Sequence, residues 1–191
     1  SYHGAKHRFE IGAETHRGLV ELARGHSASL FMVVHAAYAV LLSRLSGSND
    51  IAVGTAVAGR GEKELDDLIG MFVNTLVLRT RVDPGLSFGE FLDVVREVDL
   101  TAFSNADVPF ERLVEVLNPA RSTARHPLFQ AALSLEPGSA REVSFAGVRA
   151  VGTELEMPIS KFDIQLWLTE KTGSDDEPAG LGATFEYATD L

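Results

Sequence analysis

Residues 69–79 read Ile69-Gly70-Met71-Phe72-Val73-Asn74-Thr75-Leu76-Val77-Leu78-Arg79, an apolar stretch with one amide side chain at its centre. A continuous apolar run of this length predicts a β-strand buried on both faces. Side-chain alternation divides the strand into two faces, Phe72, Asn74, Leu76 and Leu78 on one and Met71, Val73, Thr75 and Val77 on the other. A buried amide without partners costs about 1–3 kcal/mol, so we expect Asn74 to join a hydrogen-bond network or to face a cavity.

Outward from this strand, hydrophobic periodicity predicts alternating helices and strands early in the chain and clustered strands later. Helices are expected over Ala13–Gly25, from a cap at Ser27 or Ser29 to Ser46, over about Glu62–Leu68, from a capping box at Ser87–Glu90 to Ala102, and from Asp107 to Leu117. Strands are expected over Lys6–Ile11, Ile51–Val57, Leu128–Leu135, Ser144–Val151, Lys161–Glu170 and Leu181–Tyr187, the last two forming a hairpin. This order favours a mixed α/β or α+β fold.

Composition limits the classes of function. The 191 residues carry a formal net charge of −10, which argues against nucleic acid or an anionic membrane as the main partner. No cysteine is present, so thiolate catalysis and cysteine-based zinc sites are excluded, and a cytoplasmic location is compatible with this composition. The longest apolar run, Leu30–Leu42, is too short for a bilayer span.

Two patterns that suggest catalysis or ligand binding do not hold. The glycines of residues 54–61 have the separation of a phosphate-binding loop, but Arg60 and Gly61 replace the required Lys and Ser/Thr, so nucleotide binding is disfavoured. None of the six histidines forms a metal-binding or triad pattern, so no metal site is expected. His35, inside an apolar helix, is interpreted as a core histidine bonded to a carbonyl, in preference to a catalytic role.

Four ordered segments resemble the condensation domains of nonribosomal peptide synthetases. Residues 69–76 resemble that family's IGxFVNTL strand, and residues 50–60 resemble DIVVGTPVAGR. Residues 105–114 are similar to HQDLPFExLV, with Asn105 and Ala106 in place of His and Gln. Residues 121–130 are similar to RDxSRNPLFQ, with His126 in place of Asn. Residues 161–163 and 186–191 resemble the family's closing segments.

The resemblance implies one lobe of a chloramphenicol-acetyltransferase-like fold, a mixed sheet flanked by helices. It implies that residues 1–191 are the C-terminal subdomain of a condensation domain, truncated at both ends, because the catalytic HHxxxDG motif of the N-terminal lobe is absent. The fragment alone is then expected to be inactive, with no catalytic residue of its own. The implied reaction joins two thioesters, held on the phosphopantetheine arms of carrier proteins, through an amide bond.

The resemblance also assigns roles to residues. Asn74, Thr75 and Phe72 are expected to line or support the substrate channel, although for Asn74 a purely structural role remains an equal alternative. The remaining motif residues are expected to be structural, namely Arg60, Asp107, Pro109, Phe110, Arg125, Pro127, Phe129 and Asp163. No cofactor is expected to bind directly. The expected partners are the N-terminal lobe and carrier proteins, and the isolated lobe is expected to self-associate through exposed apolar surface. An alternative is a non-catalytic module that docks a carrier protein or a tailoring enzyme.

Overall fold

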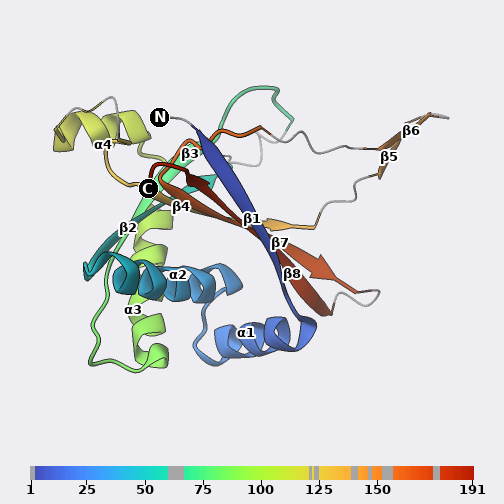
Figure 1. The fold of residues 1–191 in the computed structure, drawn as a ribbon, viewed down its shortest axis with the longest axis horizontal. Helices are drawn as coiled ribbons and strands as arrows, with labels where there is room; N and C mark the ends of the chain where they lie inside the picture. The colour runs from blue at the N-terminus through green and yellow to red at the C-terminus, as the bar shows by residue number, and fades with distance from the viewer. Residues whose placement is uncertain are drawn as a thin grey trace.

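The computed structural model describes residues 3–59, 67–120, 122, 125–138, 142–145, 148–151, 157–173 and 177–191. Its centre is a six-stranded sheet with the strand order β1-β8-β7-β4-β2-β3 (Figure 1). The strands are β1 (Gly4–Ile11), β2 (Asp50–Val57), β3 (Asn74–Arg81), β4 (Ala131–Pro137), β7 (Ile164–Thr172) and β8 (Pro178–Ala188). Two short strands, β5 (Glu142–Phe145) and β6 (Val148–Val151), pair with each other away from this sheet.

The sheet is mixed, as expected. β4 runs parallel to both of its neighbours, β2 and β7, while the pairs β1–β8, β7–β8 and β2–β3 are antiparallel. β7 and β8 form the predicted hairpin, paired from Ile164 with Tyr187 to Thr172 with Pro178. The predicted single strand over residues 144–151 is instead the β5–β6 hairpin.

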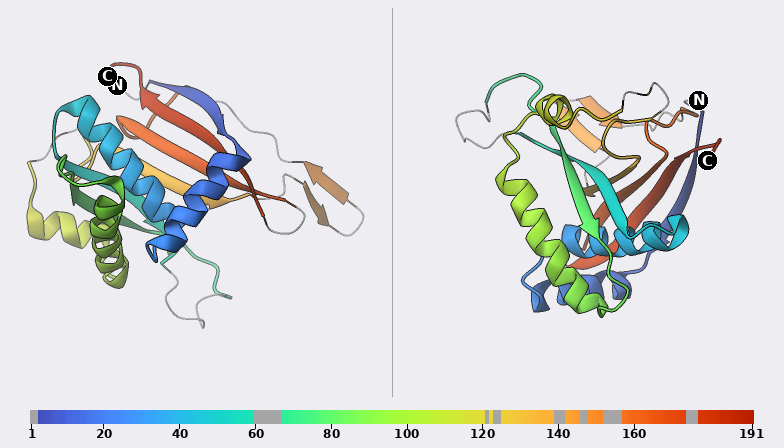
Figure 2. Two further views of the ribbon diagram at one scale, coloured as in Figure 1. Left: turned by 90° about the horizontal axis from the view of Figure 1, so that it is seen from below. Right: turned by 90° about the vertical axis from the view of Figure 1, so that its left-hand side faces the viewer.

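Three helices cover one face of the sheet: α1 (Ala13–Gly25), α2 (Leu30–Ser46) and α3 (Phe88–Ser104) (Figure 2). α1 packs against β8, α2 against β2, and α3 against both β3 and α2. The core between helices and sheet includes Val33 and Ala36 from α2, Leu92 from α3, and Val53 and Leu168 from the strands. The opposite face of the sheet carries no helix layer and is open in the described part of the chain.

The helix termini follow from their capping residues. Of the two candidate serines, Ser29 caps α2, since its Oγ accepts the Met32 N–H at 3.2 Å. Gly47 ends this helix at φ +70°, a conformation that glycine adopts at low cost. The predicted capping box at α3 is confirmed, because Ser87 and Glu90 bond each other's backbone N–H.

His35 is a core residue, but its predicted partner is wrong. Its Nδ1 lies 2.9 Å from Asp99 Oδ1, and both side chains are fully buried. The bond joins α2 to α3, so a carboxylate on a neighbouring helix takes the place of the expected carbonyl. Burial of a carboxylate requires such a partner, which only the packing of the two helices supplies.

The prediction of a strand buried on both faces over residues 69–79 is wrong in its first half. β3 begins at Asn74, and residues 67–73 form no strand, with Ile69 fully exposed and Met71 nearly so. Pairing with β2 ends where Asn74 meets Val57, the last residue of β2. β3 lies at the edge of the sheet, and only its helix-side face is buried, by Leu76, Leu78 and Thr80.

Smaller differences concern single positions. The helix α4 (Phe110–Leu117) is shorter than expected, and its last residue, Leu117, is exposed. α4 begins at Phe110 rather than at Asp107, because Pro109 stands at the N-cap with an extended ψ of 140°. Arg60 and most of the predicted helix over residues 62–68 lie outside the described residues.

Within the described residues no single helix is long and apolar enough to cross a membrane, and α1 and α2 reach that threshold only as a pair bent by 104°.

Gly54 provides a test of packing on the open face of the sheet. A Cβ at this position would lie 2.1 Å from Cε2 of Phe129, whose side chain is 1% exposed. We expect Gly54→Ala to lower the free energy of unfolding by about 1–3 kcal/mol, because the buried ring must shift. Chemical denaturation monitored by circular dichroism measures the change.

Gly18 in α1 is the matched control, since a Cβ there meets nothing within 4 Å. Gly18→Ala should leave stability unchanged or raise it by up to about 1 kcal/mol. Equal effects of the two substitutions would contradict the packing assignment.

Candidate functional site

The Asn74 side chain is fully engaged in hydrogen bonds within the chain. Its Nδ2 donates to the backbone carbonyls of Ala106 and Val108, both at 2.8 Å. Its Oδ1 accepts the N–H of Thr75 at 2.9 Å and the N–H of Phe110 at 3.1 Å. Asn74 is half-buried, and its amide connects the start of β3 to the segment between α3 and α4.

This network also completes the start of α4. The N-cap residue, Pro109, makes no side-chain capping bond. The first N–H group of the helix, that of Phe110, is instead accepted by Asn74 Oδ1, which satisfies one of the donors left open at any helix N-terminus. The sequence indicated that Asn74 needs partners but not which ones, since all of them except Thr75 lie more than 30 residues away along the chain.

The other two residues predicted to line the channel, Phe72 and Thr75, lie before and after Asn74 in the chain. Thr75 is half-buried, and its side chain belongs to the open face of the sheet, beside Gly54 and Ala56 of β2. Phe72 is half-buried in the segment before β3. Its carbonyl oxygen lies 1.7 Å from the place a Cβ would take at Gly59, whose φ of +63° also favours glycine. Glycine at position 59 therefore allows the segment of Phe72 to approach β2.

The residues predicted to be structural lie in different parts of the fold and do not form one cluster. Phe110 and Phe129 meet in one aromatic cluster, with ring centroids 6.0 Å apart. Arg125 and Pro127 are exposed and line a hollow of about 290 Å³ next to α4. The backbone carbonyl of Asp163 accepts the N–H of Ala188 at 2.9 Å. Asp107 is exposed, and its side chain has no hydrogen bond among the described residues.

The aromatic cluster contains two members that sequence reasoning did not place there. The imidazole of His126 lies with its centroid 4.1 Å from that of Phe129, and Phe162 contacts both rings. Phe162 lies within the strand expected over Lys161–Glu170, but it precedes β7 and turns to this cluster instead. The only indication in the sequence that His126 has a specific place in the structure was its position in the motif-like segment of residues 121–130.

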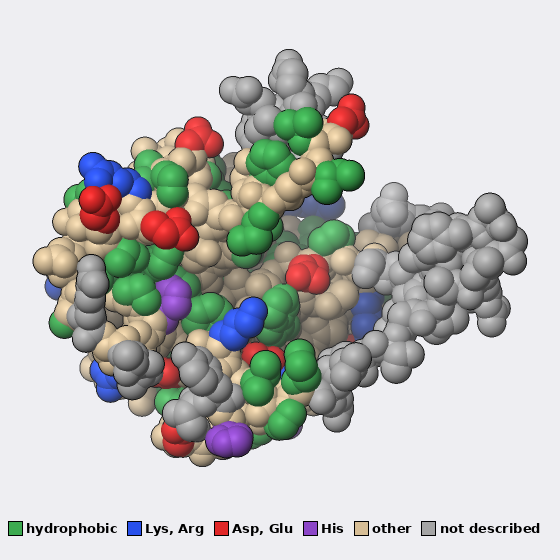
Figure 3. Space-filling model, turned by 90° about the horizontal axis from the view of Figure 1, so that it is seen from above, with side chains coloured by type: hydrophobic (Ala, Val, Ile, Leu, Met, Phe, Trp, Pro, Cys, Tyr) green, Lys and Arg blue, Asp and Glu red, His purple; other side chains and the backbone are tan. Residues whose placement is uncertain are grey.

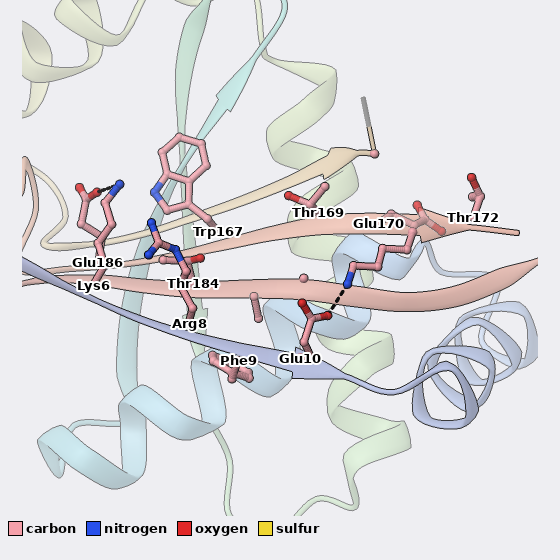
Figure 4. Close-up of a pocket in the computed structure, with 14 residues that line it drawn as sticks. Lys6, Arg8, Phe9, Glu10, Trp167, Thr169, Glu170, Thr172, Thr184 and Glu186 are labelled. Atoms are coloured by element: carbon pink, nitrogen blue, oxygen red, sulfur yellow. Dashed lines mark hydrogen bonds and ion pairs between the residues drawn. The ribbon is translucent and has the colours of Figure 1, made fainter. Parts of the chain in front are cut away.

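The open face of the sheet carries two depressions. A broad hollow of about 990 Å³ lies over β1, β8 and β7 and contains the ion pairs Lys171–Glu10, at 2.6 Å, and Lys6–Glu186, at 3.6 Å (Figure 4). A smaller recess of about 190 Å³ lies between β2, β4 and β7. Trp167 contributes to both depressions and rises from β7 in the close-up view. The space-filling view from above shows the molecule hollowed at its centre (Figure 3).

The described residues contain no group of three or more His, Asp or Glu side chains that could hold a metal ion. The fully buried His16 accepts the Gly180 N–H at Nδ1, 3.1 Å away, and its Nε2 lies 3.2 Å from Glu170 Oε1. Like His35, it is used in contacts between elements of the fold.

The Asn74 network predicts a stability effect. Asn74→Ala leaves the Phe110 N–H and the carbonyls of residues 106 and 108 without this partner, so we expect the free energy of unfolding to fall by about 2–3 kcal/mol. Urea denaturation of the parent and the variant measures the difference. Asn105→Ala is the control, because the exposed Asn105 amide bonds only the last turn of its own helix. A cost at Asn74 no larger than the cost at Asn105 would contradict the anchoring role.

The burial of His126 predicts that the stability of the fold depends on pH. Burial lowers the pKa of His126 below its ordinary value of 6.5. The unfolded chain, with the ordinary pKa, therefore binds the proton more readily than the folded one, so this contribution to stability is present above about pH 6.5 and is lost as the pH falls towards the folded pKa. His126→Asn should lose less stability than the parent between about pH 7 and pH 5.5, as measured by denaturation at each pH.

His7→Asn serves as the control for this pH effect, because His7 is exposed and lies outside the cluster. Its stability should follow the same pH dependence as the parent. A His126→Asn variant that also parallels the parent would show that burial of His126 does not contribute.

Comparison with known proteins identifies the family. The condensation domain family model matches residues 1–191. The chain is 46% identical over 191 residues to a dimodular nonribosomal peptide synthase of Bacillus subtilis (strain 168), an alignment that covers 100% of this chain and 8% of that protein. The solved complex of the X-domain and OxyB from teicoplanin biosynthesis is similar with a TM-score of 0.88 and 27% identity, over 98% of this chain and 41% of that one. The condensation domain of the monacolin K polyketide synthase MokA gives a TM-score of 0.79 and 28% identity, over 100% of this chain and 42% of that one. The chain therefore belongs to the condensation domain family.

Proposed function

We propose that this chain is the C-terminal lobe of a condensation domain in a nonribosomal peptide synthetase. The complete protein would form an amide bond between two acyl groups held as thioesters on carrier proteins. The observation that carries the proposal is the family match over all 191 residues, together with 46% identity to a dimodular nonribosomal peptide synthase. The chain spans only a small part of the curated relatives, 8% of the first and 2% of the second, so activity is proposed for the whole protein.

The proposed reaction sets clear chemical requirements. The amine of the acceptor attacks the donor's thioester carbonyl, a C–N bond forms, the C–S bond breaks, and the amine loses a proton. Catalysis then needs positioning of the two substrates, a proton acceptor, and donors to the developing oxyanion. We assign the histidine-bearing HHxxxDG motif to the N-terminal lobe and the second wall of the channel to this chain. The isolated lobe is then inactive.

We assign the channel wall to the region around Asn74 and Thr75. Asn74 holds the segment between α3 and α4 against β3 through three of its four hydrogen bonds, those to Ala106, Val108 and Phe110, which favours a role in organising the wall over direct contact with the substrate. Phosphopantetheine arms enter as parts of the substrates and not as bound cofactors. The absence of cysteine and the match to peptide synthetases support action in the cytoplasm.

The exposed apolar side chains before β3 fit a contact with the N-terminal lobe. Leu68, Ile69, Met71 and Val73 are all more than half exposed in the structure. An apolar surface of this kind is typical of an interface. We assign it to the lobe contact in the complete domain and to self-association of the isolated chain.

A second candidate is a non-catalytic module that docks a partner enzyme. The specific observation in its favour is the similarity to the X-domain solved in complex with OxyB, at a TM-score of 0.88. The two candidates differ in the segment that would carry the HHxxxDG motif, since only a catalytic domain requires it intact.

The test of the proposed function is product formation by the complete protein. We expect mass spectrometry to detect the amide product on the acceptor carrier, and Asn74→Ala to slow its formation by about 10-fold, since a misplaced wall impairs positioning. Folding of the variant is verified first by circular dichroism, and Asn105→Ala, at an exposed amide, should leave the rate unchanged.

Three outcomes separate the readings of this experiment. A normal rate in folded Asn74→Ala would exclude Asn74 from the channel wall. Absence of product from the parent protein would favour the docking module. Product formation that depends on Asn74 supports the condensation function and the assigned wall together.

A further inference from the structure

The helix α4 is the least embedded helix of the structure. None of its side chains is buried, and Figure 1 shows it at the margin of the molecule, apart from the layer of α1, α2 and α3. The ion pair between Arg112 and Glu115 lies within the helix and does not attach it to other elements. A helix of about two turns is not stable in water by itself, so α4 depends on contacts with its neighbours.

The first residue of α4, Phe110, attaches the helix at its N-terminal end. The centroid of its ring lies 5.2 Å from that of the His126 imidazole and 6.0 Å from that of Phe129. Its N–H donates to Asn74 Oδ1 at 3.1 Å. The aromatic cluster and this hydrogen bond therefore hold the start of the helix in place.

His126 contacts every ring of the cluster. Its centroid lies 4.1 Å from Phe129, 5.2 Å from Phe110 and 5.4 Å from Phe162. Its backbone carbonyl accepts the Nε2 of Gln130 at 2.9 Å, which fixes the chain on either side of the ring. Its Nδ1 is buried and has no hydrogen bond among the described residues. A proton on Nδ1 would thus be a buried donor without an acceptor.

The charged side chains near the cluster do not compensate such a proton. The three elements that pack on the imidazole do so through aromatic rings. The ionisable side chains of the same segments are those of Glu111, Arg112, Arg125, Lys161 and Asp163. All except the half-buried Asp163 are exposed, and none of them bonds the imidazole in the described part of the chain. Burial is accordingly the physical cause that lowers the pKa of His126.

The neighbours of His126 differ in how firmly they are held. Phe129 is 1% exposed, and its ring lies against Gly54 of β2. Phe162 is held at its backbone, where its carbonyl accepts the Ser160 hydroxyl at 2.6 Å. Phe110 belongs to a helix without a buried side chain. Displacement of α4 therefore brings water to the imidazole at the smallest loss of packing.

We propose that the contact between His126 and Phe110 is a proton-sensitive attachment of α4. Protonation of the imidazole releases Phe110 and opens α4 locally, while the sheet and the layer of α1, α2 and α3 stay folded. The release also breaks the hydrogen bond between Phe110 and Asn74. The inference concerns a conformational change of this chain and does not depend on amide-bond formation.

The pH dependence of the opening has a definite direction. In the open form the imidazole is in water and titrates near its ordinary value of 6.5, whereas burial lowers the pKa of His126 in the closed form. The open form binds the proton more readily, so opening is favoured as the pH falls below about 6.5. Between about pH 7.5 and pH 5.5 this linkage raises the opening constant by at most about 10-fold.

Hydrogen exchange of the complete protein, followed by mass spectrometry of its peptides, measures the opening. The quantity compared is the protection factor of the α4 peptide, corrected for the intrinsic exchange rate at each pH. We expect it to fall by about 3- to 10-fold from about pH 7.5 to about pH 5.5. The peptide of the buried helix α2 is the internal reference, and its pH dependence should be the same in the parent and in every variant.

Two substitutions remove the titrating group. His126→Phe keeps an aromatic ring in the cluster, and His126→Asn introduces the residue of the family motif, which takes up no proton. We expect α4 to lose the pH-dependent fall in protection in both variants. His7→Asn is the matched control, because His7 is exposed on β1 and lies outside the cluster, and it should behave as the parent does.

Phe110→Ala tests the attachment itself. This substitution removes the ring that His126 holds, so we expect α4 to be weakly protected at every pH, with protection of the α2 peptide unchanged. Full protection of α4 in this variant would show that other contacts hold the helix, and would overturn the inference.

The remaining outcomes are equally clear. A fall in protection that is confined to α4 and disappears in His126→Phe supports the inference. A fall that persists in His126→Phe, or that extends equally to the α2 peptide, assigns the pH effect to another group or to unfolding of the whole lobe and overturns it. Protection of α4 that rises in acid also overturns it, because attraction between the imidazolium and the three rings would then outweigh the cost of burying the charge.

Discussion

Burial of one face of the six-stranded sheet is the constraint on which the rest of the structure depends. The three helices α1, α2 and α3 occupy that face, and the core between them and the sheet includes buried side chains of β2, β4, β7 and β8. Because the side chains of a strand alternate, every residue that turns away from this core must face the other side. Thr75, Gln165 and Trp167 therefore lie together on the open face because of strand alternation alone. The packed hydrophobic layer on the other side of the sheet holds their strands in place.

A buried polar contact between α2 and α3 also orients these two helices within the helix layer. His35 and Asp99 are both fully buried and bond each other between the two helices. A pair of this kind contributes little net stability compared with apolar packing, but it fixes the relative position of the two helices, since removal of either partner leaves the other unsatisfied. Asn74 has the corresponding role at the sheet edge, where it holds the segment before α4 against β3.

The sequence predicted well what local physics determines. The capping box at Ser87, the end of α2 at Ser46 and the β7–β8 hairpin all depend on residues close together in the chain, and all are present. The sequence failed where a partner decides the outcome. The apolar run before Asn74 does not continue the strand, because β2 ends opposite Asn74.

The candidate site shows the same division. That Asn74 requires hydrogen bonds followed from its residue type, but the identity of its partners depends on the packing of a segment that no periodicity connects to β3. The recess at Gln165 escaped prediction for the same reason, since its wall joins β2, β4 and β7 with a ring from the loop before β4. The channel roles of Asn74, Thr75 and Phe72 remain predictions.

The contact between Gly54 and Phe129 makes two distant positions of the chain depend on each other. The ring takes the volume that a side chain on β2 would otherwise fill, so one cavity is shared by two positions far apart in the sequence. A larger residue at position 54 fits only together with a smaller one at position 129, and neither position is free to change alone. The shape of the open face at this point thus depends on both residues together, and exchanging the pair would reshape the surface while the helix-covered core stays as it is.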